Sequence, residues 1–295
     1  MKIAMIGDSN AGKTTYMAMM YESMVKGFKN FRLAAKDAEY GAELLATAVD
    51  IRKSRYPEPT SQRSRYDFDL SQKKQVFFDF SWSDYRGGAL LDRATEGDAK
   101  ELHADLRAAD GIIVFADAAR FADDPGVRRH ARRLTAACEW AAAERTQKTP
   151  VVVAYTKADT VRDRGAWARA MEPLSALHSI LDDAPGVHSV TVRVSCGRRP
   201  KNVHIPVLWC LSHHIIDRVD ELAEDRRRYT ARAEELMAGA SLGNSWRSWL
   251  NSTESEAKKS REQSRRAEQA YREMLPLQDP ARDLEKLIRR HLDQK

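Results

Sequence analysis

The sequence has few cysteines and no long apolar run. An odd number of widely spaced cysteines without a CxxC pair or a Cys/His cluster argues against a disulfide framework or a zinc site, and a reducing cytosol is the simplest compartment. The three cysteines are Cys138, Cys196 and Cys210. The longest apolar stretch, Ile205–Ile216, is interrupted by one serine and two histidines, so it is too short to span a bilayer. An apolar run starting almost at Met1 leaves no room for a signal peptide.

Long runs of one charge are also missing. Charged residues make up 31% of the 295 residues and the net charge is +6, but Lys and Arg are mostly interleaved with Asp and Glu. There is no RNA-binding signature, which argues against nucleic acid as the main ligand and leaves nucleotides or acidic partners. The length suffices for one sizeable domain with an extension, or for two small domains.

A glycine-rich segment near the N-terminus is the strongest motif. Ile3–Ile6 is a short apolar run that predicts a buried strand, and Gly7–Thr14 then fits G-x-x-x-x-G-K-[ST] at every fixed position. A helical pattern follows, with apolar residues on one face at Met17, Met20, Tyr21 and Met24. Strand, loop and helix therefore come in the order that a phosphate-binding loop requires. The plainer interpretation is a glycine turn with a chance lysine.

This phosphate loop, Gly7–Thr14, has a specific chemistry. Glycines let backbone N–H groups turn inward toward phosphate oxygens, and the helix N-terminus adds partial positive charge. Lys13 supplies a full positive charge, and the Thr14 hydroxyl is a hard oxygen ligand suited to Mg²⁺. The predicted nucleotide contacts in this region are Asn10, Ala11, Gly12, Lys13, Thr14 and Thr15. The loop by itself does not distinguish ATP from GTP.

A second acidic position follows another predicted strand. Gln75–Trp82 alternates apolar residues on one face and leads into Ser83–Gly88, which contains D-x-x-G. Asp84 at this strand end could hold Mg²⁺ through water, and the Gly87 N–H could reach a γ-phosphate oxygen. The alternative is an ordinary loop in which Asp and Gly are common.

Two further apolar runs, Gly111–Ala116 and Val151–Tyr155, predict buried strands, and the second leads directly into Thr156-Lys157-Ala158-Asp159. This T-K-x-D resembles the guanine-specificity motif of GTPases, [NT]-K-x-D. The resemblance implies that Asp159 accepts hydrogen bonds from guanine N1–H and N2–H₂, a donor pair that adenine lacks, and that the Lys157 stem packs along the base. A lysine–aspartate turn at a strand end is the plainer alternative.

A last predicted strand, Ser189–Val194, precedes Ser195-Cys196-Gly197. This resembles the S-A motif whose backbone contacts the guanine oxygen, with Cys196 in place of alanine. The four motifs follow the chain order of Ras-like P-loop GTPases over residues 1–218. The resemblance implies a three-layer α/β fold: a mixed, mostly parallel six-stranded sheet with helices on both faces and GTP or GDP at the carboxyl ends of the strands.

The segment before the next strand, Arg65–Leu70, is unusually long. Asp37–Lys53 reads as an extra helix, a helical insertion at about 36–54, with an apolar stripe at Tyr40, Leu44, Ala48 and Ile51. It is followed by Pro57-Glu58-Pro59-Thr60. Thr60 is the preferred candidate for the first-switch threonine that closes on Mg²⁺ and the γ-phosphate, ahead of Thr47 inside the helix. The insertion, the P-x-P-T segment and W-x-D-x-x-G-G resemble the bacterial double-GTPase family, which implies a bacterial signalling or conflict system.

One position departs from Ras-like enzymes. Many carry a glutamine just after D-x-x-G that orients the attacking water, and here that position is Gly88, without a side chain. Unassisted hydrolysis should therefore be slow, unless Gln62, Arg86 or a partner's arginine takes over. Arg86 could stabilise charge on phosphate oxygens, although a solvated switch arginine is the preferred interpretation.

The C-terminal part reads as helical and charged. Asn202–Ile216 is the expected last helix of the nucleotide domain, and 219–295 forms a charged α-helical extension in which Gly239 and Gly243 break the helix. Ser245–Met274 reads as a solvated helix or a partly disordered segment. Pro280 is expected to precede a separate short amphipathic helix.

The leading hypothesis is a GTP-binding switch that hydrolyses GTP to GDP and phosphate with Mg²⁺. A protein effector or activator would contact the switch loops or the C-terminal helices, and an oligomer is possible. Gly88 motivates a second hypothesis, a nucleotide-bound scaffold that does not hydrolyse GTP. A third is an ATP-dependent ATPase or kinase on the same loop, against which T-K-A-D argues.

Overall fold

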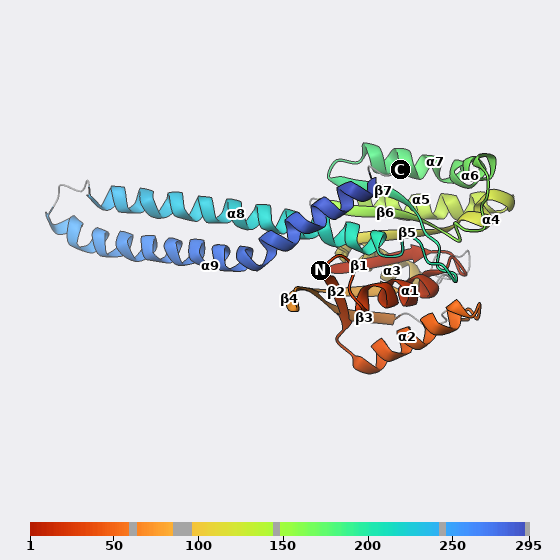
Figure 1. Ribbon diagram of the computed structural model, residues 1–295. Coiled ribbons are helices and arrows are strands. Elements are labelled where there is room, and N and C mark those ends of the chain that lie inside the picture. The colour runs from red at the N-terminus through yellow and green to blue at the C-terminus, as the bar shows by residue number, and fades with distance from the viewer. Residues whose placement is uncertain (59–63, 85–95, 144–147, 242–245, 293–295) are drawn as a thin grey trace. The chain divides into compact units, whose positions relative to one another are not determined.

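The computed structural model describes residues 1–58, 64–84, 96–143, 148–241 and 246–292 (Figure 1). These residues form two compact units, Met1–His214 and Ile215–Lys295. In the described part of the chain, no helix is long and apolar enough to cross a membrane.

The first unit is built on a mixed sheet whose strands follow the order β2-β3-β4-β1-β5-β6-β7. The strands are β1 Lys2–Gly7, β2 Phe31–Ala35, β3 Ser64–Gln72, β4 Gln75–Asp84, β5 Gly111–Asp117, β6 Thr149–Thr156 and β7 Val187–Arg193. β3 pairs antiparallel with β2 and β4, whereas β1 pairs parallel with β4 and β5, and β6 pairs parallel with β5 and β7. Every strand except β3 therefore runs in the same direction.

The predicted fold class, a mixed and mostly parallel sheet with helices, is confirmed, but the strand count was wrong. The described sheet has seven strands rather than six, and β2 is the strand without a sequence prediction. β2 extends the sheet because its alternate residues Phe31 and Leu33 are buried while Arg32 and Ala34 are exposed. This alternation is the ordinary pattern of a strand with one covered face.

Helices cover both faces of the sheet. The helices of the described chain are α1 Lys13–Val25, α2 Ala38–Arg52, α3 Glu96–Ala108, α4 Ala118–Asp123, α5 Val127–Ala143, α6 Arg164–Met171, η2 Glu172–Leu174, α7 Ser175–Asp183, α8 Ile205–Ser241 and α9 Trp246–Leu292, of which α9 belongs to the second unit. One face of β1, β5 and β6 packs against apolar residues of α3, α5 and α7. On the other face Tyr16 of α1 contacts Phe115 of β5, and Cys210 of α8 lies against Gly111.

The predicted helical insertion corresponds to α2. The Asp37 carboxylate caps its first turn by accepting hydrogen bonds from the N–H groups of Glu39 and Tyr40, at 2.9 and 3.2 Å. Its buried residues are Gly41, Leu44, Ala48 and Ile51, so the stripe at spacing three and four faces inward.

The second unit contains the rest of α8, followed by α9, running side by side in opposite directions (Figure 1). Between them Arg218 forms an ion pair with Glu273 at 3.1 Å, the Arg226 guanidinium lies 4.1 Å from the centre of the Tyr271 ring, and the Ser260 hydroxyl donates to the Ala233 carbonyl at 3.0 Å.

Two expectations about helix ends in this region were wrong. α8 continues through Gly239 to Ser241, and α9 runs without a break past Pro276 and Pro280, so Pro280 does not begin a separate helix. Each proline removes one backbone donor, but the helix continues because apolar residues on both sides of the prolines, such as Met274 and Leu284, are buried. Gly243 lies outside the described residues.

Candidate functional site

The phosphate loop connects the end of β1 to the start of α1. A Cβ on Gly7 would lie 2.8 Å from the carbonyl oxygen of Phe115 in β5, so only glycine allows this close approach. Gly12 has φ of +83°, the left-handed conformation that glycine adopts without strain. α1 begins one residue later, at Lys13, so the N-terminus of this helix, with its partial positive charge, faces the loop.

Lys13 folds back over the loop. Its Nζ donates to the carbonyl oxygens of Gly7 and Asp8, at 3.1 and 3.2 Å, and the residue is only 8% exposed. A buried ammonium is costly unless it has partners, and an anionic ligand would be a stronger partner than two carbonyls. The loop therefore presents a fixed positive charge to whatever it encloses.

The predicted base motif, Thr156–Asp159, is tied to the phosphate loop. The Thr156 Oγ1 lies 2.8 Å from the carbonyl oxygen of Ala11 and 3.2 Å from that of Ala116. Lys157, at a positive φ of 53°, donates from Nζ to the Asp117 carboxylate at 2.5 Å. These contacts join the ends of β5 and β6 to the loop, so the two motifs keep a fixed relation.

The segment after β7 packs beside Thr156–Asp159 and forms another wall of the site. The Ala158 N–H donates to the Val194 carbonyl at 3.1 Å, and Ser195 exchanges two backbone hydrogen bonds with Lys201, at 3.1 and 2.9 Å. Burial, with a smaller contribution from the charge of Asp159, raises the pKa of the Cys196 thiol to about 12. Cys196 therefore stays protonated at neutral pH and packs as a small apolar side chain.

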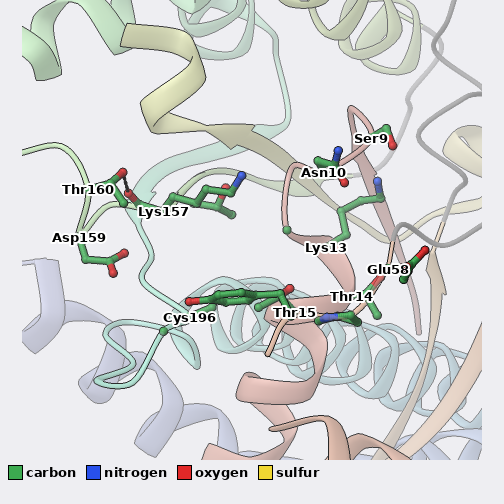
Figure 2. A pocket seen from close by; sticks show the side chains of 15 residues that line it. Ser9, Asn10, Lys13, Thr14, Thr15, Glu58, Lys157, Asp159, Thr160 and Cys196 are labelled. Carbon is green, nitrogen blue, oxygen red and sulfur yellow. Dashed lines mark hydrogen bonds between the residues drawn. The ribbon is translucent and has the colours of Figure 1, made fainter. Parts of the chain in front are cut away.

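These segments surround a central cavity of about 540 Å³ (Figure 2). It is lined by Ser9, Asn10, Gly12, Lys13, Thr14, Thr15, Tyr56, Pro57, Glu58, Thr156, Lys157, Asp159, Thr160, Cys196 and Gly197. Figure 2 shows Asp159 toward one end of the cavity and Lys13 with Thr14 toward the other. The carboxylate proposed for the base and the ammonium proposed for the phosphates thus face one space from two sides.

Most of the described site residues predicted from the sequence line this cavity, and two do not. Ala11 is 2% exposed and takes part through its carbonyl oxygen, which accepts from Thr156. Ser195 lies in the wall of an adjoining pocket, together with Asp159 and Arg193.

The predicted switch residues are not placed. Thr60, Gln62, Arg86, Gly87 and Gly88 lie outside the residues that the structure describes. Asp84 is the last residue of β4, where its backbone is in register with Met5 of β1. Its side chain also lies outside the described part, so its role as a magnesium ligand remains a prediction.

Several residues of the site had no sequence prediction. Tyr56, Pro57 and Glu58 line the cavity from the segment just before Thr60. Asp117 does not line it but holds Lys157, and it also accepts from the Arg120 N–H at 3.2 Å to cap α4. A carboxylate directly after the buried strand Gly111–Ala116 was an available signal for Asp117. Tyr56 offered none, because only the tertiary fold brings it to the cavity.

The residues present fit a nucleoside polyphosphate. The left-handed Gly12, the buried Lys13 and the start of α1 form a cradle for anionic oxygens. The hydroxyl of Thr14, on the cavity wall, has the chemistry of a hard magnesium ligand. Asp159 supplies an acceptor-only group for a base edge with two donors. Together, the fold and this cavity define a P-loop nucleotide-binding protein.

A family model named Double-GTPase 2 matches residues 2–195, and the chain belongs to this family. Membership in a GTPase family, together with the fold, supports GTP binding. The sequence has no significant match among curated proteins.

Solved structures with a similar fold have low sequence identity. A bacterial selenocysteine-specific elongation factor EF-Sec matches with 15% identity and a TM-score of 0.40, over 72% of this chain and 28% of that one. The signal recognition particle receptor SRb–GTP/SRX complex from Chaetomium thermophilum matches with 13% identity and a TM-score of 0.42, over 66% of this chain and 93% of that one. A probable GTP-binding protein engB matches with 13% identity and a TM-score of 0.34, over 70% of this chain and 93% of that one. This chain thus spans just over a quarter of the elongation factor.

Proposed function

We propose that the protein is a GTP-binding molecular switch that hydrolyses GTP to GDP and phosphate with Mg²⁺. The observation that carries this proposal is the central cavity, in which the phosphate loop and the carboxylate of Asp159 face the same space. Lys13 and the N–H groups at the start of α1 would bind the phosphates, and Asp159 would select guanine.

The chain's own residues would mainly bind and position the nucleotide. Thr14, Thr60 and Asp84 are the residues proposed to hold Mg²⁺, which when bound neutralises charge on the phosphate oxygens. Gly87 would donate its N–H to the γ-phosphate, and Arg86 is a candidate for further charge stabilisation. Since Gly88 has no side chain to orient water, unassisted hydrolysis should be slow.

We extend the proposal to the organisation of the chain. Residues 1–218 would form the nucleotide-binding domain and 219–295 an arm that contacts a protein effector or activator. A bacterial signalling or conflict system is the expected setting. The three free cysteines motivate a location in the reducing cytosol.

The experiment that tests the base assignment is Asp159→Asn. An amide at this position favours xanthine over guanine, since it can donate to the second xanthine oxygen while it no longer accepts two hydrogen bonds. We expect affinity for GTP to fall about 10- to 100-fold and affinity for XTP to rise, measured by titration of the full chain. Asp279→Asn, an exposed aspartate in α9, is the matched control and should leave both affinities unchanged. Unaltered guanine selectivity in Asp159→Asn would show that Asp159 does not read the base.

Gly88 favours one alternative, a scaffold that binds GTP without hydrolysing it. Single-turnover release of inorganic phosphate separates the two. Release of phosphate by the wild type that disappears in Lys13→Ala supports the switch. The absence of any release from GTP-loaded protein supports the scaffold.

A further inference from the structure

The phosphate loop contains a carboxylate of its own. Asp8 is the second residue of the loop, next to Ser9 and Asn10, and both of these neighbours line the central cavity while Asp8 does not. A negative charge inside a loop that binds a polyphosphate would repel the ligand, because the two charges are separated by only a few ångströms of poorly solvated space. Something must therefore hold this carboxylate away from the cavity and offset its charge.

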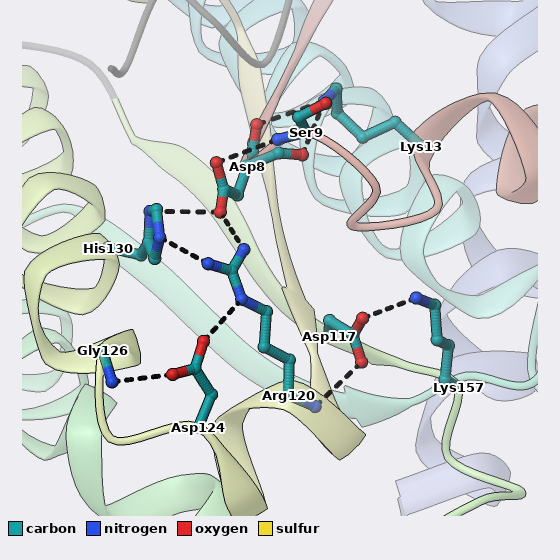
Figure 3. Close-up of polar contacts among 10 residues, drawn as sticks. Asp8, Ser9, Lys13, Asp117, Arg120, Asp124, Gly126, His130 and Lys157 are labelled. Carbon is teal, nitrogen blue, oxygen red and sulfur yellow. Dashed lines mark hydrogen bonds and ion pairs between the residues drawn. The ribbon is translucent and has the colours of Figure 1, made fainter. Parts of the chain in front are cut away.

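The Asp8 carboxylate points toward α4 and α5 (Figure 3). Its Oδ2 forms an ion pair with Arg120 Nη1 and lies 3.1 Å from His130 Nδ1. Its Oδ1 accepts from the Ser9 N–H at 2.9 Å. The Asp8 side chain is only 13% exposed, so protein groups rather than water satisfy the charge.

Arg120 is itself fixed from three directions. Its Nε donates to the Asp124 carboxylate at 3.0 Å, and its Nη2 lies 2.7 Å from His130 Nε2. Its backbone N–H donates to Asp117, the same carboxylate that holds Lys157 of the base motif. Such a guanidinium loses little additional freedom when it pairs with Asp8, so the pair is stronger than a typical surface ion pair.

His130 fits this arrangement as a neutral ring. If Nδ1 carries the proton, it donates to Asp8 while Nε2 accepts from Arg120, which satisfies both contacts at once. Burial lowers the pKa of His130 despite the opposing charge of Asp8, in keeping with this neutral form.

We propose that Arg120, supported by His130, is a positioning residue that turns the Asp8 carboxylate out of the central cavity and cancels its charge, so that the phosphate loop can accept a polyphosphate. The proposal rests on the proposed function, because it assigns the cavity to a phosphate-bearing ligand. Arg120 acts through Asp8 and is not a contact of the ligand.

The test is a cycle of Arg120→Met, Asp8→Asn and the double variant, made in the full chain. Affinity is measured for guanosine, GMP, GDP and GTP at fixed ionic strength. In Arg120→Met the uncompensated Asp8 charge should weaken GTP binding about tenfold, GDP and GMP progressively less, and guanosine not at all. In the double variant the carboxylate is gone, so GTP affinity should return to within about twofold of the wild-type value.

Arg128→Met is the matched control. Arg128 lies on α5 beside the same region and pairs with Glu172 at 3.1 Å, but its side chain is 67% exposed and does not contact the phosphate loop. It should leave all four affinities unchanged. His130→Gln, whose amide retains one donor and one acceptor, should bind GTP as the wild type does, whereas His130→Leu should show part of the loss seen in Arg120→Met.

A merely structural role for Arg120 predicts a different pattern. The double variant would then bind GTP as weakly as Arg120→Met or worse, and guanosine affinity would fall together with GTP affinity; either result overturns the proposal. Tripolyphosphate, used as a probe without a base, separates this failure from that of the proposed function. If guanine selectivity is absent but tripolyphosphate binding still depends on Arg120 and recovers with Asp8→Asn, only the base assignment is wrong. If the wild type binds neither tripolyphosphate nor the guanine nucleotides, both proposals are wrong.

Discussion

At the scale of single residues, the site is organised by how its charged side chains are partnered. Lys13 donates to carbonyl oxygens and Lys157 donates to Asp117. Asp8 pairs with Arg120 and lies within contact distance of His130. Each ion is held close to a loop that would contact nucleotide, and none depends on a long unsupported side chain. This arrangement favours binding by preorganisation, since little side-chain freedom remains to be lost when a ligand enters.

His130 makes a prediction about stability and pH. Its folded-state pKa is lowered from 6.5, first by burial, then through Arg120 and Arg133, against the opposing charges of Asp8 and Asp124. The unfolded chain therefore binds the proton first as pH falls. This contribution to stability is present above about pH 6.5 and is lost as pH drops from there through the folded-state pKa.

We expect the free energy of unfolding of the wild type to decrease between about pH 7 and about pH 5, and His130→Gln to show a smaller decrease. Urea denaturation across this range measures it. His178, whose pKa is also lowered by burial, remains in both proteins and contributes equally. An identical pH dependence in the two proteins would mean that folding does not lower the pKa of His130.

At the scale of elements, Thr156 links the end of β6 to the phosphate loop. Its buried hydroxyl reaches the carbonyls of Ala11 and Ala116, and Thr156→Val would leave both without this donor at nearly constant volume. We expect a loss of about 1–3 kcal/mol in the free energy of unfolding, together with weaker nucleotide binding. Chemical denaturation measures the first quantity.

Thr156→Ser provides the control for this prediction, because it keeps the hydroxyl and should retain most of the stability. If valine retains the stability of the wild type while serine loses it, methyl packing rather than the hydrogen bond fixes the loop.

The elements that the sequence predicted well are those with a strong local signal. β1, β5 and β6 are buried on both faces and read as unbroken apolar runs, and α2 shows an inward stripe after the capping residue Asp37. β2 was missed because five residues with only two buried side chains give little periodicity. α9 was divided wrongly at Pro280, because local proline preferences were outweighed by burial of the residues beyond it.

The same distinction applies to the site. The phosphate loop and Thr156–Asp159 are contiguous motifs, so they could be found before any fold was known. Arg120 and His130 meet Asp8 across more than 100 residues of chain. Only the pairing of β1 with β5 brings these segments together, and no spacing rule in the sequence encodes it.

At the scale of the whole molecule, the chain divides between a nucleotide-binding unit and a helical unit of different composition. The division falls between His214 and Ile215, close to the proposed limit at residue 218. The helical unit is held by ion pairs and by the contact of Arg226 with Tyr271. It exposes Met237 and Leu275, at 57% and 48% of their surface, which would suit the proposed contact with a protein partner.

The central claim is that the cavity between the phosphate loop and Asp159 binds guanine nucleotides. It is tested most directly by titrating nucleotide-free full-length protein with GDP, GTP and ATP in the presence of magnesium. The account predicts saturable binding of GDP and GTP, with ATP weaker by about 100-fold or more. Equal or tighter binding of ATP, or no binding of either guanine nucleotide, would contradict it.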